Sequence, residues 1–223
     1  MKKIPSIQKT AKTAGWLYLS LIPLGLMGIM YIPTLIVDGN IAETISNIIA
    51  NESLFRLSIV SALLVQLVNL FVVLYLYKLL KPVNKKVAKL MVLFIFLAIP
   101  IAMLNELNYG AVLLLIHSAE QSPALVSLFL NLHEYGVNIA QIFWGLWLFP
   151  MGYLVHKSGF LPKIIGILLM IGCFGYFADS FIYFLNPDFG ITFSEFLFIG
   201  EVALPLWLVT KGVNMTKWKS LQN

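Results

Sequence analysis

The chain has 223 residues, of which 60% are hydrophobic and 11% are charged, and its mean hydropathy is +0.89. A soluble domain carries roughly 25% charged residues, so this composition excludes an ordinary water-soluble protein and indicates a membrane protein. The formal net charge of +5 does not indicate a nucleic-acid partner, because the positions of the basic residues follow a membrane topology pattern.

Six apolar blocks follow one another along the sequence. Each is long enough for a helix across a bilayer, which takes roughly 20 apolar residues. Backbone polar groups find no water in hydrocarbon, so helices rather than strands are expected. The blocks cover residues 14–37, 54–77, 90–116, 125–155, 164–185 and 192–213. We therefore predict an all-α fold, in which residues 1–223 form a single polytopic domain, a six-transmembrane-helix bundle.

The segment between the first two blocks has the pattern of a short amphipathic helix. Ile41, Ile45, Ile48 and Ile49 recur at a spacing that places them on one helical face. We expect this helix to lie on the outer surface, either as a lid over a cavity or as a simple connector.

The lysines predict the orientation of the bundle. They fall before residue 13 and within residues 78–89, 157–163 and 211–219, all on one side of a six-span chain. The opposite segments, residues 38–53, 117–124 and 186–191, contain no lysine or arginine. Because positive charge is retained inside the cell, both termini are expected to be cytoplasmic. The same lysines are expected to contact anionic membrane lipids.

Seven ionisable side chains fall inside the predicted spans, where burying a charge is costly enough to make each one a candidate functional group. They are Arg56, Glu106, His133, Glu134, Asp179, Glu195 and Glu201. At roughly 1.5 Å rise per residue, all of them lie between the outer interface and the middle of the bilayer. We therefore predict a polar, ligand-binding cavity that opens to the outside above an apolar floor. Its candidate residues are His133, Glu134, Asp179, Glu201, Glu106, Arg56 and Asn138, the last on the same helical face as Glu134.

These side chains also have structural interpretations. Arg56, near the end of its span, reaches either lipid headgroups or a carboxylate. Glu106 and Glu201 lie deep enough to require a partner or a proton. Asp179 serves a ligand or only fastens helices together. For His133, proton transfer, metal binding and ligand binding compete with an interhelical hydrogen bond.

Three motifs resemble one bacterial membrane family. Residues 145–181 read GLWLFPMGYLVHKSGFLPKIIGILLMIGCFGYFADSF, residues 77–86 read YKLLKPVNKK, and residues 198–213 read FIGEVALPLWLVTKGV. In these runs the chain resembles the bacterial integral membrane family called domain of unknown function 4386. The resemblance implies a bacterial plasma membrane. It also implies that His133, Gly136, Asp179 and Glu201 match a histidine, a glycine, an aspartate and a glutamate usual in the family, without naming a chemistry.

Three functions remain open at this point. The predicted cavity favours binding or transport of a small molecule, lipid or ion. A structural or partner-binding membrane subunit, in which polar side chains join helices, is the alternative. An intramembrane metal-dependent lipid hydrolase is a second alternative, in which His133 would need Glu106, Asp179 or Glu201 as further metal ligands. No HxxxH or HExxH pair is present, and no motif names a cofactor.

Overall fold

The structure, a computed structural model, describes residues 7–119 and 122–221, which form helices and their connections and contain no strand. Four of the described helices are long and apolar enough to cross a membrane: α3 (Glu52–Leu80), α4 (Lys85–Ile116), α5 (Pro123–Ser158) and α6 (Lys163–Leu185). They coincide with the second to fifth apolar blocks. The prediction of an all-α fold is confirmed, and these helices indicate a membrane protein.

The first and last apolar blocks form interrupted helices. α1 (Ile7–Leu26) continues into a π-helical turn, η1 (Met27–Tyr31), and a 3-10 turn, η2 (Ile32–Leu35). Pro33 cannot donate a backbone N–H, so the regular α-helical ladder does not continue through η2. Near the other end of the chain, α7 (Ser194–Leu197) and α8 (Ile199–Thr210) meet at Phe198. The described residues thus contain four uninterrupted helices long and apolar enough to cross a membrane, and a six-span topology is a proposal.

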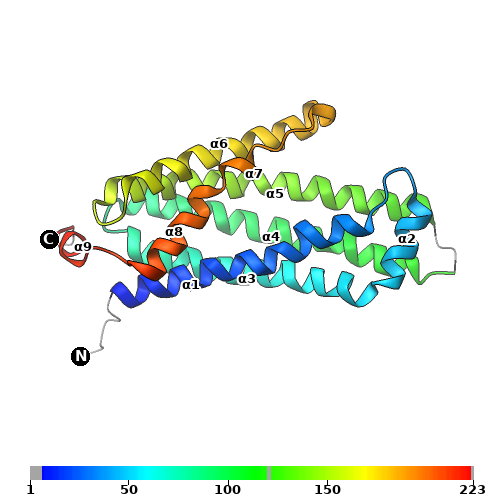
Figure 1. Cartoon of the computed structure of the whole chain (residues 1–223), viewed down its shortest axis with the longest axis horizontal. Helices are drawn as coiled ribbons and strands as arrows, with labels where there is room; N and C mark the ends of the chain where they lie inside the picture. The colour runs from blue at the N-terminus through cyan, green and yellow to red at the C-terminus, as the bar shows by residue number, and fades with distance from the viewer. Residues whose placement is uncertain (1–6, 120–121, 222–223) are drawn as a thin grey trace.

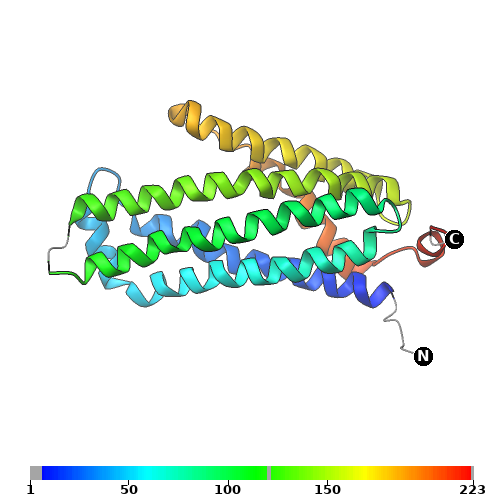
Figure 2. The ribbon, with the colours of Figure 1, turned by 180° about the vertical axis from the view of Figure 1, so that it is seen from behind.

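The long helices pack in a closed ring. α3, α4, α5 and α6 follow one another as neighbours, α6 packs on α8, α8 packs on α1, and α1 packs on α3. Figure 2 shows α3, α4 and α5 running side by side, and Figure 1 shows α1 and α8 on the opposite face. A short 3-10 turn, η3 (Pro187–Phe189), connects α6 to α7 at the far end of α6. Every helix of the ring therefore has two helical neighbours.

α2 (Ile41–Ala50) lies across one end of this ring, which we call the α2 end (Figure 1). The side chain of Asn40 caps the helix by accepting a hydrogen bond from the Glu43 N–H at 3.1 Å. Ile45 and Ile48 are buried among residues of η2, α3, α4 and α5. The predicted amphipathic helix is present, and its apolar face covers protein rather than lying free on a membrane.

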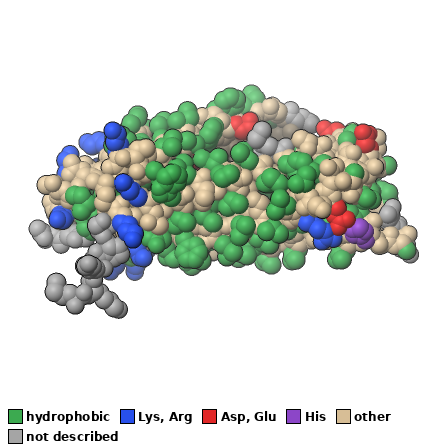
Figure 3. Space-filling view, turned by 60° about the horizontal axis from the view of Figure 1, so that its bottom comes forward, with side chains coloured by type: hydrophobic (Ala, Val, Ile, Leu, Met, Phe, Trp, Pro, Cys, Tyr) green, Lys and Arg blue, Asp and Glu red, His purple; other side chains and the backbone are tan. Residues whose placement is uncertain are grey.

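Lysines collect at the opposite end, which we call the lysine-rich end (Figure 3). α1 begins there, and α9 (Met215–Ser220) lies there as well (Figure 1). Between the two ends runs a belt of exposed apolar side chains, which on α4 extends from Leu90 to Leu114. At 1.5 Å per residue this belt is about 36 Å tall, close to the roughly 30 Å of a bilayer core. The molecule therefore has the surface of a membrane-embedded bundle.

Two apolar clusters divide the interior. The larger cluster fills the half near the lysine-rich end and joins all six helices of the ring, with fully buried side chains such as Leu76, Met91 and Leu148. The smaller cluster lies beneath α2 and includes Phe55 and Val112. The candidate site lies between the two clusters.

Candidate functional site

His133 and Glu106 form an intramembrane pair across the interface of α5 and α4. The Nε2 atom of His133 lies 3.2 Å from Oε1 of Glu106, and the two side chains are only 11% and 12% exposed. α4 and α5 are antiparallel neighbours joined by a short connection, which places residue 106 opposite residue 133. Glu106 is two turns from Leu114, so the pair lies about 12 Å below the edge of the apolar belt.

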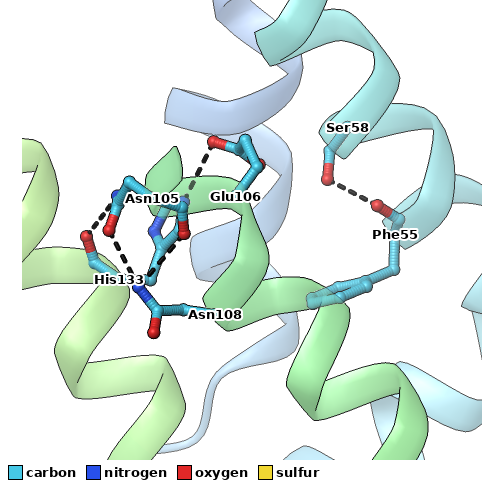
Figure 4. A network of polar contacts seen from close by, with 6 residues as sticks. All are labelled: Phe55, Ser58, Asn105, Glu106, Asn108 and His133. Atoms are coloured by element: carbon cyan, nitrogen blue, oxygen red, sulfur yellow. Dashed lines mark hydrogen bonds and ion pairs between the residues drawn. The ribbon is translucent and has the colours of Figure 1, made fainter. Parts of the chain in front are cut away.

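Neighbouring polar side chains hold this pair in place (Figure 4). Asn105 donates from Nδ2 to the backbone oxygen of His133 at 2.8 Å. Asn108 donates to both the backbone oxygen of Asn105, at 3.1 Å, and its Oδ1, at 2.9 Å. The ring of Tyr109 stacks on the imidazole of His133, with centroids 3.5 Å apart and planes 12° apart. The imidazole therefore has little freedom to rotate.

Gly136 makes this arrangement possible. A Cβ atom at this position would overlap the side-chain amide of Asn105. Only a glycine lets Asn105 reach across from α4 to the backbone of α5, in the way that small residues allow close helix contacts in membranes. The family resemblance pointed to this glycine, and the structure supplies a physical reason for it.

In the part of the chain that the structure describes, only one of the two carboxyl oxygens of Glu106 has a hydrogen-bond partner. Its second oxygen, Oε2, is buried and has no hydrogen-bond partner among the described residues. A buried carboxylate oxygen without a donor is unfavourable by roughly 1–3 kcal/mol or more. The site thus offers an acceptor beside His133 and near Tyr109, whose ring lies 5.0 Å from that of Phe55.

The two other predicted residues of α5 face elsewhere. Glu134 is exposed and lies near the hydroxyl of Tyr183 on α6. Asn138 donates from Nδ2 to the backbone oxygen of Glu134 at 3.0 Å, a contact within α5 itself. The structure therefore does not bring Glu134 and Asn138 together with the His133–Glu106 pair.

Arg56 also lies outside the pair. Its Nε is 2.6 Å from Oε1 of Glu52, one helical turn away, and its side chain is 55% exposed. The other oxygen of Glu52 lies 2.9 Å from Nε2 of His117. These three residues join α3 to the end of α4 at the rim of the α2 end. The partner of Arg56 is thus an acid just before the apolar block, not one inside a span.

Asp179 joins helices. Its two carboxylate oxygens accept hydrogen bonds from the backbone N–H groups of Phe193, at 2.6 Å, and Ser194, at 2.8 Å. These groups lie at the start of α7, where helical N–H groups have no partner within their own helix. Asp179 therefore caps one half of the interrupted last helix from the neighbouring helix α6.

Glu201 belongs to a second polar cluster, at a different depth. Tyr18 of α1 donates to Oε2 of Glu201 at 3.2 Å, and Tyr176 of α6 lies near the same carboxyl group. Oε1 of Glu201 is buried without a hydrogen-bond partner. α4 and α6 both begin at the lysine-rich end (Figure 1). Measured from that end, Tyr176 lies about 20 Å along α6, whereas Glu106 lies about 31 Å along α4. Glu201 is thus nearer the middle of the apolar belt than the His133–Glu106 pair.

Sequence reasoning did not assign a site role to Tyr109, Tyr18 or Tyr176. Tyr109 follows Glu106 by three positions and shares its helical face, a signal that the spacing contains. Tyr18 and Tyr176 come from helices that meet Glu201 only in the folded ring, so no local spacing indicates them.

The ligand set required by the hydrolase alternative is not assembled. Within residues 7–119 and 122–221, no group of three or more His, Cys, Asp or Glu side chains is arranged to hold a metal ion. His133 has Glu106 as a neighbour, whereas Asp179 caps α7 and Glu201 contacts Tyr18. The side chains that the hydrolase alternative would need as metal ligands therefore lie at three separate places in the bundle.

These features define an all-helical membrane bundle with partly satisfied carboxyl groups in its interior. The family described as "Domain of unknown function (DUF4386)" matches residues 13–212, and the chain belongs to this family. One relative, a protein of the archaeon Archaeoglobus fulgidus described as "Uncharacterized protein", is 32% identical over 161 residues, which cover 72% of this chain and 86% of the relative. No solved structure matches the chain.

Proposed function

We propose that the protein is a six-span protein of a prokaryotic plasma membrane that binds a small ligand at the His133–Glu106 pair, with both termini in the cytoplasm. The two interrupted segments complete the ring of six helices, which supports counting them as spans. Broken helices are compatible with a membrane where neighbouring protein surrounds them. The collection of lysines at one end supports the orientation.

The observation that carries the binding proposal is the buried Oε2 atom of Glu106, which has no donor among the described residues. A ligand that brings a cationic or hydrogen-bond-donating group would satisfy it. We therefore expect a small organic cation, such as an ammonium compound, rather than an anion.

The packing favours binding over transport. The half near the lysine-rich end is filled by the larger apolar cluster, and among the described residues no chain of buried charged groups leads toward that end. α2 and the smaller apolar cluster cover the site from the other side. A ligand would enter beneath α2, so α2 acts as the lid in this proposal.

Ethylammonium chloride is a suitable probe for this site. The thermal unfolding of the detergent-purified protein would be followed against ethylammonium, with sodium chloride at equal ionic strength as the reference. A ligand at 100 times its Kd stabilises the folded state by about 2.7 kcal/mol. We expect a rise in the unfolding temperature for the wild type and none for Glu106→Gln. Glu195→Gln, which changes an exposed acid, is the matched control.

Native mass spectrometry would identify a natural ligand. The wild type is compared with Glu106→Gln and His133→Ala after mild extraction from membranes. An extra mass retained by the wild type and lost in both variants supports the proposal. A bare polypeptide together with no response to ethylammonium would refute it.

A structural subunit is the second candidate, favoured by the contacts of Asp179 and Asn105. Both side chains are used to join helices, Asp179 at α7 and Asn105 at the backbone of α5. In that case substitutions at Glu106 and His133 lower stability but change no bound mass. A partner protein that stays bound through purification would favour this candidate.

A further inference from the structure

A groove of about 520 Å³ opens on the lipid-facing side of the bundle, where α4, α5 and α6 meet in the half near the lysine-rich end. Its lining is apolar and includes Leu90 and Phe94 of α4, Phe149 and Tyr153 of α5, and Phe174 of α6. Leu90, Phe149 and Phe174 are 42%, 45% and 63% exposed, so the groove opens outward rather than into the core. It lies away from the His133–Glu106 pair.

Each of the three helices also carries one exposed lysine in line with the groove. On α4, Lys86 precedes Leu90 and Phe94 by four and eight positions. On α5, Lys157 follows Tyr153 by four positions and Pro150 by seven. Residues at these spacings share a helical face, so both lysines continue the lined faces toward the lysine-rich end.

The third lysine is on α6. Lys163 precedes Phe174 by eleven positions and Phe177 by fourteen, which is three and four helical turns. Within the described residues, the acids of the spans lie in the middle or toward the α2 end, and none lies beside these three lysines. Lys86 and Lys157 therefore lie within about one turn of the groove lining, and Lys163 lies about 15 Å along α6 from Cys173, toward the same end of the molecule; no carboxylate of the described residues neutralises the three charges.

We propose that this groove binds one anionic phospholipid of the leaflet on the lysine-rich side. One acyl chain lies in the groove, and the phosphate lies among Lys86, Lys157 and Lys163. The distance along α5 from Lys157 to Leu146, the groove residue farthest from Lys157 on that helix, is about 16 Å. This is close to the thickness of one leaflet, which is half of a roughly 30 Å bilayer core. Basic side chains at this level attract anionic headgroups.

A single acyl chain suits the groove better than a partner helix, because a helix with its side chains is about 10–12 Å across and an extended acyl chain is much narrower. The charge pattern and the dimensions thus agree on a lipid, and this inference does not depend on the ligand of the His133–Glu106 pair.

The test is lipid retention by the full-length protein. Delipidated protein is mixed with equal amounts of phosphatidylglycerol and phosphatidylcholine that carry the same acyl chains, and bound lipid is counted by native mass spectrometry. We expect the wild type to retain one phosphatidylglycerol with at least about tenfold preference. Equal retention of the two lipids would overturn the proposal.

Two pairs of variants test the lysine contact with the lipid headgroup and the acyl-chain contact with the groove separately. The triple variant Lys86→Gln, Lys157→Gln and Lys163→Gln should lose the preference. The control triple Lys12→Gln, Lys217→Gln and Lys219→Gln removes the same charge from exposed lysines outside the groove and should keep it. Equal loss in both triples would show that net charge, not this site, selects the lipid.

A tryptophan can fill the groove. Leu90→Trp should abolish retention, whereas Leu93→Trp, at a 51% exposed position outside the lining, should not. Leu146→Trp fills the same groove from α5 and serves if Leu90→Trp does not fold. Full retention by folded Leu90→Trp and Leu146→Trp would refute the acyl-chain site.

Discussion

Nε2 of His133 and Oε1 of Glu106 lie 3.2 Å apart across two neighbouring membrane helices, and the ring of Tyr109 covers the imidazole. The histidine is thereby held from three directions, by a carboxyl group, by an aromatic face and through its own backbone oxygen by Asn105. The contact uses Nε2 of the imidazole and Oε1 of Glu106, and the second oxygen of Glu106 has no hydrogen-bond partner among the described residues.

His133→Ala should destabilise the protein by about 2–4 kcal/mol, because it leaves the Glu106 carboxyl without its partner and removes the stacked ring from Tyr109. Unfolding in a detergent titration measures the change. The double variant His133→Ala, Glu106→Gln should lose less than the sum of the two single variants, since the two residues contact each other. Strict additivity would show that the pair contributes nothing.

Gly136→Ala should cost about 1–3 kcal/mol, because the new methyl group overlaps the side chain of Asn105. Gly110→Ala is the matched control on α4, where a Cβ meets nothing within 4 Å. There the substitution should be neutral or stabilising by about 0.5–1 kcal/mol, since alanine favours a helix over glycine. Adding Asn105→Ala to Gly136→Ala should recover part of the loss. Equal effects of Gly136→Ala and Gly110→Ala would contradict the packing described.

Asp179→Ala should loosen the start of α7, because the N–H groups of Phe193 and Ser194 lose their acceptors. Hydrogen exchange of residues 193–198 measures this local opening, and we expect it to be at least tenfold faster. Glu195→Gln, an exposed change within α7, should leave exchange nearly unaltered. Unchanged exchange in Asp179→Ala would remove the capping role.

The topology can be tested with single cysteines. Cys173 is buried and is the only cysteine of the chain, so Cys173→Ser provides a background for labelling. In intact cells, a membrane-impermeant maleimide should label a cysteine that replaces Glu43 of α2 but not one that replaces Lys219 of α9. The reverse pattern would invert the orientation. Labelling of both positions would contradict an arrangement with α2 and α9 on opposite sides.

Hydropathy was sufficient to predict the four uninterrupted helices, and isoleucine spacing to predict α2. It was not sufficient for the first and last blocks, because a window average measures how apolar a segment is, not whether its hydrogen-bond ladder continues. The start of α7 is capped by a carboxylate from another helix, Asp179, which no local pattern contains.

The candidate site was likewise predictable from the sequence only in part. Glu106 and His133 lie at similar distances from the turn between their helices, so counting along an antiparallel hairpin suggests that they meet. The surroundings of Glu201 depend on α1, α6 and α8, three segments that are distant in sequence. Their meeting follows from closure of the ring, which composition and periodicity do not describe.

Closure of the ring by α1 and α8 has a consequence for synthesis. Gly15 of α1 packs so closely on α8 that a Cβ there would lie 2.9 Å from the backbone oxygen of Pro205. Roughly 170 residues separate the two helices, so at 5–20 residues per second α1 waits about 10–35 s for this partner. Throughout that interval the flank of the first helix is open to lipid or to the insertion machinery. A nascent chain that stops short of α8 would present that unpaired flank to the quality-control proteases of the cell.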